Sequence, residues 1–198
     1  MIRRWFRRRA LPASDADGRV GPGPVARVEE AAERGDVDAM TAWGAVLFQR
    51  HDRAGALHWW TRAWEAGNVA AAFNLGTLHD LEGDTNRAQV IWERAAALGD
   101  PDAMLGLVRQ ALERGDEATM DRWAPSVLAQ RQAFPITALG VAFEADGREE
   151  RAVHAYLRAE ELGDAYAMEY RARILDRRGA HREAAALRAR AATAERML

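Results

Sequence analysis

The sequence contains neither cysteine nor lysine, and all 28 of its basic residues are arginine. Without cysteine the chain cannot form disulfides, bind zinc through thiolates or use a cysteine nucleophile. Without lysine it cannot contain a phosphate-binding loop of the Gly-x-x-x-x-Gly-Lys type. The five histidines are scattered singly, and no His-x-x-x-His pair is present to bind a metal. We therefore expect no catalytic residues, no cofactor and no metal, and we predict that the chain is not an enzyme.

Long apolar runs are also missing, since no stretch approaches the roughly 20 residues that a membrane-spanning helix needs. The arginine-rich start resembles the basic region of an export signal. However, the segment ALPASDADGRV follows it, where such a signal would have an apolar stretch. These absences predict a cytoplasmic protein.

The residues that are abundant favour helices. Hydrophobic residues make up 48% of the chain and charged residues 29%, which is too apolar for wholesale disorder. Alanine, leucine, glutamate and arginine are strong helix formers, whereas β-branched and aromatic residues, which favour strands, are scarce. With 198 residues the chain has room for one domain and a tail. The composition predicts an all-α protein.

Charge is distributed unevenly along the chain. Residues 1–9 contain five arginines and no acidic residue, and the remainder contains 23 arginines against 30 acidic residues, a net charge of −7. Nucleic-acid-binding surfaces are basic, so the acidic body disfavours a nucleic-acid partner. We expect a basic arm and a flexible linker rich in glycine and proline over residues 1–23, and a folded domain over residues 24–198.

A glycine followed by a helix-capping residue recurs on a sixteen-residue grid. The pairs are Gly35-Asp36, Gly67-Asn68, Gly83-Asp84, Gly99-Asp100, Gly115-Asp116 and Gly163-Asp164. Gly147 and Gly179 lie on the same grid, and only His51 and Arg131 replace glycine there. Glycine adopts the left-handed conformation that ends one helix, and Asp or Asn accepts the free N–H groups that open the next. Each interval therefore predicts one helix of about three turns.

Every second interval matches better, so the repeating unit has 32 residues. When the units are aligned, residues 32 positions apart form columns of similar type. These columns include Ala39, Ala71, Ala103 and Ala167; Trp43, Leu75, Leu107 and Leu139; Gly44, Gly76 and Gly140; and Trp60, Trp92, Ala124 and Tyr156. Small and large apolar residues alternate at helical spacing, as close-packed helices require. Five units over residues 36–195 and a half-unit over residues 24–35 predict eleven antiparallel helices.

Two units depart from this pattern. Unit three has Pro125 inside its second helix, which we expect to kink or split that helix, and Arg131-Gln132 in place of Gly-Asp. Unit five has Arg171 and Arg188 where other units are apolar, which is typical of a terminal cap.

Four of the seven tryptophans lie in unit one. Trp43 and Trp60 fall in core columns and are predicted to fill space beside small residues. Trp59 and Trp64 belong to less consistent columns, so the sequence leaves open whether they are core or a ligand-binding aromatic patch.

The clearest copies of the unit are AMTAWGAVLFQRHDRAGALHWWTRAWEAG and AAFNLGTLHDLEGDTNRAQVIWERAAALG. They have an Ala-x-x-x-Leu-Gly core, with Trp-Gly in the first copy, and close on WW or IW-x-Arg-Ala. These features resemble the tetratricopeptide repeat and the Sel1-like repeat. The resemblance implies a right-handed α-solenoid of five 32-residue helix–turn–helix repeats with an N-terminal half-repeat cap, whose first helices line a concave groove.

Carrying that groove over by column gives a set of candidate partner-binding residues. They are Phe73, Thr77, Leu105, Arg109, Phe134, Thr137, Val141, Tyr166, Glu169 and Arg173. Apolar residues among arginine and glutamate suit a peptide or protein segment, and Arg109 and Arg173 are suited to pair with its carboxylates.

The basic arm is a second candidate contact region. Ile2, Trp5 and Phe6 lie on one helical face with arginine elsewhere, and the candidate contacts are Arg3, Arg4, Trp5, Phe6, Arg7 and Arg8. The sequence leaves four readings of the arm: a tail without a role, contact with an anionic membrane surface, contact with an acidic protein partner, or contact with nucleic-acid phosphate.

The predicted function is a non-catalytic protein–protein interaction scaffold or adaptor that presents its groove to a partner. The alternative is an assembly or regulatory factor that the arm tethers to the membrane surface, peripheral at its inner face.

Overall fold

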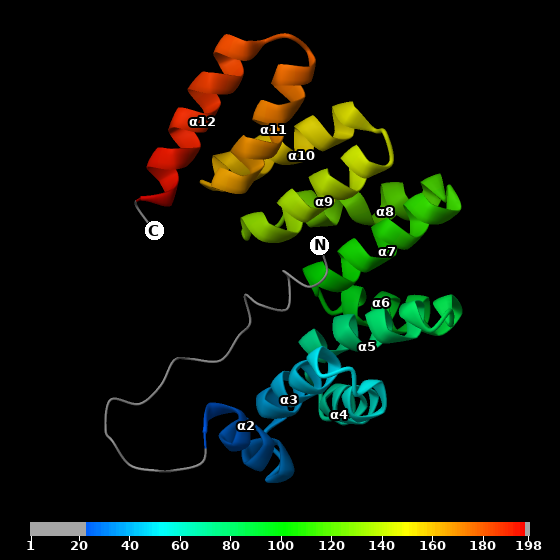
Figure 1. The fold of residues 1–198 in the computed structure, drawn as a ribbon. Helices are drawn as coiled ribbons and strands as arrows, with labels where there is room; N and C mark the ends of the chain where they lie inside the picture. The colour runs from blue at the N-terminus through cyan, green and yellow to red at the C-terminus, as the bar shows by residue number, and fades with distance from the viewer. Residues whose placement is uncertain (1–22, 197–198) are drawn as a thin grey trace. The chain divides into compact units, whose positions relative to one another are not determined.

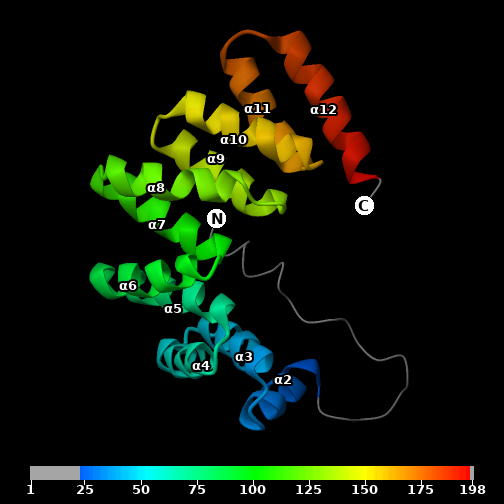
Figure 2. The ribbon, with the colours of Figure 1, turned by 180° about the vertical axis from the view of Figure 1, so that it is seen from behind.

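The computed structural model describes residues 23–196, and this part of the chain is all-α with eleven helices. The helices are α2 (Pro24–Glu33), α3 (Val37–Gln49), α4 (Arg53–Glu65), α5 (Val69–Leu81), α6 (Thr85–Ala97), α7 (Pro101–Arg114), α8 (Glu117–Leu128), α9 (Ala133–Ala145), α10 (Glu149–Glu161), α11 (Ala165–Arg177) and α12 (His181–Glu195). Consecutive helices within a repeat form hairpins, as both views show (Figures 1 and 2). The predicted all-α class and helix number are confirmed.

Left-handed residues connect the helices, as the glycine grid predicts. All eight grid glycines have a positive φ, between 67° and 96°. His51 also adopts this conformation, with a φ of 66°, and it is the only non-glycine residue in the described part of the chain to do so. Arg131 does not, so the link between α8 and α9 lacks the left-handed turn that closes the other links.

Side-chain caps open six of the helices. The capping residues are Asp36, Asp52, Asn68, Asp84, Asp116 and Asp164, each of which accepts a backbone N–H two or three residues on, at 2.8–3.3 Å. These bonds satisfy amides that a helix start leaves unpaired. Five of these sites confirm cap positions predicted after a grid glycine, and Asp52, which follows His51, is the sixth cap.

By its contacts the chain divides into two compact units, Met1–Asp100 and Pro101–Leu198. The first unit contains α2 to α6 and the second contains α7 to α12. The single domain expected over residues 24–198 stays a prediction.

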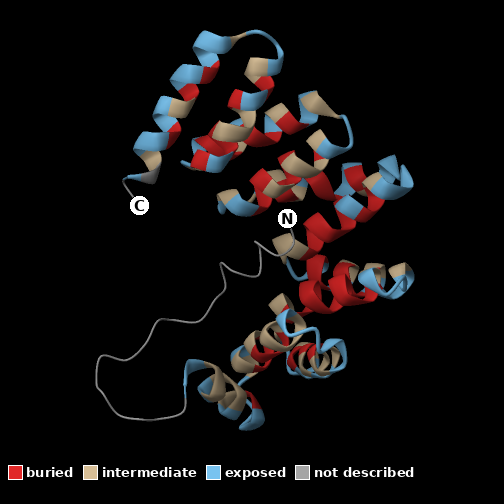
Figure 3. Ribbon diagram, viewed as in Figure 1, coloured by how far each residue is buried: buried red, intermediate tan, exposed pale blue. Residues whose placement is uncertain are grey.

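The core of each unit follows the predicted columns. Figure 3 shows buried residues along the helices, densest on α5 and α7. The members of the column that runs from Trp60 to Tyr156 are all buried, as are Trp43 and the three leucines of its column. Only Ala39, at the start of α3, is half-buried where the pattern predicts full burial.

Pro125 does not split its helix, so of the two predicted outcomes, a kink or a split, the split is wrong. Helix α8 runs without interruption from Glu117 to Leu128. Pro125 is exposed, so its ring faces solvent, whereas Ala124 and Val127 beside it are buried. Packing of that buried side outweighs the one backbone hydrogen bond that proline cannot donate.

The polar positions of the last repeat form ion pairs between helices. Arg171 on α11 donates to Glu160 of α10 at 2.8 Å, and Arg188 on α12 donates to Asp176 of α11 at 2.7 Å. Arginines therefore replace apolar contacts where the repeat array ends.

Within residues 23–196, no helix combines the length and apolar character needed to cross a membrane.

Candidate interaction surface

The candidate partner-binding residues fall in both units. Phe73 and Thr77 lie on α5 of the first unit, and the other eight lie on α7, α9 and α11 of the second. In the second unit α9 contacts both α7 and α11, so its first helices are neighbours (Figure 1). The second unit therefore brings together most of the predicted set.

Four candidates are buried and do not present side chains to a partner, contrary to the prediction. They are Phe73, Thr77, Leu105 and Thr137. The Phe73 side chain is 8% exposed and its ring stacks on Trp92 at 6.4 Å between centroids. Thr77 Oγ1 donates to the Phe73 carbonyl at 2.8 Å, which satisfies a buried hydroxyl. These positions are core because each first helix packs against neighbouring helices on two sides. The groove prediction assumed that one side of each first helix is open to a partner.

The remaining candidates form an open surface on the second unit. Phe134 is 38% exposed and Tyr166 is 45% exposed, Arg109 and Arg173 are exposed, and Val141 is half-buried. We call these five residues the α7–α9–α11 face. Phe134 and Tyr166 occupy the same repeat position, near the starts of their helices. Arg109, Val141 and Arg173 share another repeat position, seven residues and about two helical turns further along. Exposed aromatic rings beside arginines are typical of protein-binding surfaces.

Two carboxylates next to this face are already engaged within the chain. Asp164 caps α11 and accepts from Thr137 Oγ1 at 3.0 Å. The candidate Glu169, which is half-buried, accepts from Arg188 of α12. These contacts leave less negative charge available to neutralise the arginines of the face.

The two arginines of the face lack such partners. In the described part of the chain neither Arg109 nor Arg173 has a carboxylate within ion-pair distance. Arg173 lies over the ring of Tyr170, 4.3 Å from its centroid, which orients the guanidinium. Glu113, four residues after Arg109 on α7, has no ion-pair partner in the part of the chain that the structure describes. The face therefore offers guanidinium groups to an incoming carboxylate.

Tyr170 is a residue of this region that the sequence analysis missed. Its ring stacks on buried Tyr156 at 5.4 Å with planes 8° apart. Tyr156 donates to Glu144 Oε2 at 2.8 Å, and burial, with that contact second, raises the pKa of its phenol. The available signal was the spacing of Tyr166, Tyr170 and Arg173, which places them on one side of α11.

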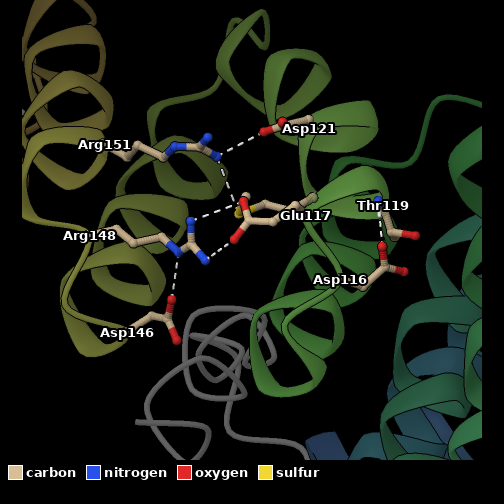
Figure 4. A network of polar contacts seen from close by, with 8 residues as sticks. Asp116, Glu117, Thr119, Asp121, Asp146, Arg148 and Arg151 are labelled. Carbon is tan, nitrogen blue, oxygen red and sulfur yellow. Dashed lines mark hydrogen bonds and ion pairs between the residues drawn. The ribbon is translucent and has the colours of Figure 1, made fainter.

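Several other arginines of the second unit are bound to carboxylates. Arg148 donates to Glu117 and Asp146, and Arg151 donates to Asp121 at 2.9 Å (Figure 4). Hydrogen bonds to Glu117 and Asp146 raise the pKa of Arg148. At the same end of α10, a hydrogen bond from Arg178 lowers the pKa of Glu149, to which it donates at 2.8 Å.

A shallow depression lies beside this network. Its lining residues are Gly147, Arg148, Glu149, Glu150, Arg151 and Arg178. Glu149 and Arg178 pair with each other across it, so its charges are largely satisfied internally.

The tryptophans of the first unit are mainly structural. Trp43 and Trp60 are buried, which confirms the core prediction. Trp59 and Trp64 are half-buried and pack against the cluster around Trp43. Arg62 and Arg94 stack over these two rings at 4.7 and 5.2 Å. Trp59 and Trp64 therefore pack at the edge of the core, and arginines cover the outer faces of their rings.

The remaining predictions concern the arm and metals. The candidate contacts Arg3, Arg4, Trp5, Phe6, Arg7 and Arg8 lie outside the described residues. Within residues 23–196, no three His, Asp or Glu side chains converge in a way that would hold a metal ion.

Comparison with solved structures identifies the fold. No family model matches the sequence, and no curated protein matches it at a significant level. A Sel1 repeat protein from Oxalobacter formigenes superimposes with a TM-score of 0.58 over 85% of this chain and 84% of that one, at 17% identity. The chain has the Sel1-like and tetratricopeptide repeat fold.

Other proteins with a similar fold differ widely in sequence. Pseudomonas aeruginosa protein PA5086 matches with a TM-score of 0.64 and 20% identity, covering 99% of this chain and 81% of that one. MamA matches with a TM-score of 0.54 and 18% identity, over 78% and 95% of the two chains. At this divergence the shared property is the repeat fold, in which α7, α9 and α11 are the first helices of their repeats.

Proposed function

We propose that this repeat protein is a non-catalytic interaction scaffold or adaptor that binds a protein segment on the α7–α9–α11 face. The observation that carries the proposal is the combination of exposed Phe134 and Tyr166 with Arg109 and Arg173, which have no carboxylate partner in the described chain. The repeat fold supports it, because its regular helices give an ordered surface rather than a catalytic cavity.

The partner segment contains carboxylates and an apolar side chain. Arg109 and Arg173 lie on either side of Val141 in the repeat, on helices that each contact α9. Packed helices are spaced about 8–10 Å apart, so the two arginines lie roughly 20 Å apart. An extended segment covers that span in about six residues. Two acidic residues separated in this way, with an apolar residue between or beside them, complement the face.

Affinity capture by the full chain tests the proposal when three proteins are compared. The test variant is Arg109→Glu/Arg173→Glu, and the control is Arg182→Glu/Arg190→Glu, which makes the same charge change at exposed positions of α12. Proteins identified by mass spectrometry should bind the parent and the control. They should bind the test variant about 5- to 150-fold more weakly, since interface anchors contribute roughly 1–3 kcal/mol. Equal capture by all three would remove this face as the binding site.

The membrane-surface alternative rests on the arm alone. Co-sedimentation with anionic and neutral vesicles tests it, comparing the full chain with a Trp5→Ala/Phe6→Ala variant. Selective pelleting of the parent chain with anionic vesicles would support tethering at the inner face of the membrane. A cytoplasmic location, with nucleic acid disfavoured by the acidic body, stays part of the proposal.

A further inference from the structure

The junction between α8 and α9 differs from the other helix junctions. Each other link between described helices contains a residue with positive φ, whereas residues 129–132 contain none. Gln132, at the N-cap of α9, makes no side-chain capping bond. The chain therefore leaves α8 without the tight turn that fixes the next helix elsewhere.

Packing at this junction is also rearranged. Within each unit the second helix of a repeat packs broadly on the following first helix, as α4 does on α5 and α10 on α11. Here α8 contacts α9 only sparsely, and α7 makes the larger contact with α9. The contact between repeats three and four therefore lies mainly between their first helices, and α8 itself is packed on α7 but only sparsely on α9.

Arginines of α10 reach across to α8 at three points. Arg148 donates to Glu117 at 3.1 Å, and Arg151 donates to Asp121 at 2.9 Å (Figure 4). Arg158 donates to the Leu128 carbonyl at 3.3 Å, at the other end of α8. The donors are spaced by three and seven residues on α10 and the acceptors by four and seven on α8, so each set follows one side of its helix. Asp146 accepts from Arg148 Nε at 2.6 Å and holds its guanidinium toward Glu117.

These contacts are placed where solvent weakens them. The Glu117 and Asp121 side chains are 53% and 62% exposed. Exposed ion pairs contribute little singly and are screened by salt. The two ion pairs and the Arg158 hydrogen bond lie along one side of α8, so their combined effect opposes any outward movement of α8.

We propose that the α8–α9 junction is a joint, and that Arg148, Arg151 and Arg158 form a latch that holds α8 against repeat four. When the latch is released, repeat three turns about the α7–α9 contact. That movement changes the position of Arg109 relative to Val141 and so reshapes the α7–α9–α11 face. The latch itself does not depend on the proposed function, because it concerns only contacts within the second unit.

Hydrogen exchange of the full chain, read by mass spectrometry, tests the latch. The variant is Arg148→Gln/Arg151→Gln, and the control is Arg182→Gln/Arg190→Gln on exposed positions of α12. We expect about 10-fold faster exchange over residues 117–132 in the variant, with α10 to α12 and the first unit unchanged. The parent should show the same local increase when NaCl is raised from 0.05 to 1 M, and the control should match the parent.

Two results would overturn the proposal. One is exchange at α8 that is unaltered in the variant, and the other is an increase spread evenly over the second unit, which would indicate general destabilisation. Arg151 also lies over the Phe143 ring at 5.8 Å, so loss of its stem requires a separate control. The charge swap Asp121→Arg/Arg151→Asp should restore slow exchange relative to Arg151→Asp alone. If it does not, the ion pair is not what holds α8.

Discussion

Gly44 of α3 lies against the indole of Trp60 on α4 so closely that a Cβ at Gly44 would be 2.6 Å from the indole nitrogen. The same nitrogen donates to the Thr41 carbonyl at 3.1 Å, one turn earlier on α3. Gly140 approaches Tyr156 in the same way sixteen residues apart. The two helices of these repeats are thus joined by a ring that occupies the place of a missing side chain.

Replacing Gly44 by Ala should destabilise the protein, even though alanine is the better helix former by about 1 kcal/mol. Trp60 is 1% exposed, so its ring is buried and cannot swing out into solvent without losing core contacts. Overpacking of this kind costs about 1–3 kcal/mol. Chemical denaturation should report a lower midpoint with an unchanged slope.

A double-mutant cycle provides the control for that result. Trp60→Phe removes the indole edge that the new methyl group would meet. In that background the penalty of Gly44→Ala should shrink by about 1 kcal/mol or more, as contacting residues are coupled. Strictly additive penalties would show that the ring is not the obstacle.

Phe73 and Phe134 are both candidate groove residues, three positions apart in the repeat, but should respond differently to truncation. Phe73→Ala removes a buried ring stacked on Trp92 and should cost about 3–5 kcal/mol of unfolding free energy. Phe134→Ala removes an exposed ring and should change stability by about 0.5 kcal/mol or less, while weakening partner capture. Thermal unfolding of the two variants beside the parent measures the contrast. Similar losses would contradict the division of these residues into core and surface.

His51 and Arg131 are the two grid positions without glycine, and they form a matched pair of tests. His51 has a φ of 66°, in the region where a side chain is strained, so His51→Gly should raise stability by about 0.5–1 kcal/mol. Arg131 lacks this conformation, so Arg131→Gly should be neutral or destabilising through added freedom of the unfolded chain. Differential scanning calorimetry of both variants measures the two changes in stability. Stabilisation by both would show that the effect at His51 does not come from its positive φ.

His79, on α5, should make stability depend on pH. Burial and, secondarily, Arg87 lower the pKa of its imidazole below about 6.5, and Asp84 and Glu82 oppose that shift only in part. The unfolded chain therefore takes up the proton first, so stability is full above about pH 7. It declines as the pH falls through 6.5 toward the lowered value. The melting temperature should thus be lower at pH 5.5 than at pH 7.5.

Substitution separates His79 from the other titrating groups. His79→Gln should reduce the decline in melting temperature between pH 7.5 and 5.5, because glutamine binds no proton in this range. His154→Gln, at an exposed position of α10, should leave the decline as it is in the parent. An identical decline in the His79 variant would assign the effect to other groups.

At most junctions the sequence predicted where one helix ends and the next begins. Glycine paired with Asp or Asn is a local signal, because the left-handed turn and the capping bond form between residues close in the chain. Asp36 and Asn68 cap as predicted for this reason. Pro125 shows the limit of local reasoning, since buried neighbours keep α8 continuous through it.

The sequence by itself thus determined the helices, their ends and the columns that become core, because periodic burial and capping are encoded within about one helical turn. Only the tertiary structure decided that Phe73 and Leu105 are core while Phe134 and Tyr166 are surface. It also paired Arg148 with Glu117 and stacked Arg173 on Tyr170, with no carboxylate partner for Arg173 among residues 23–196. These outcomes depend on which side chains of other helices come within contact distance, and a repeat pattern does not specify that for residues thirty positions apart.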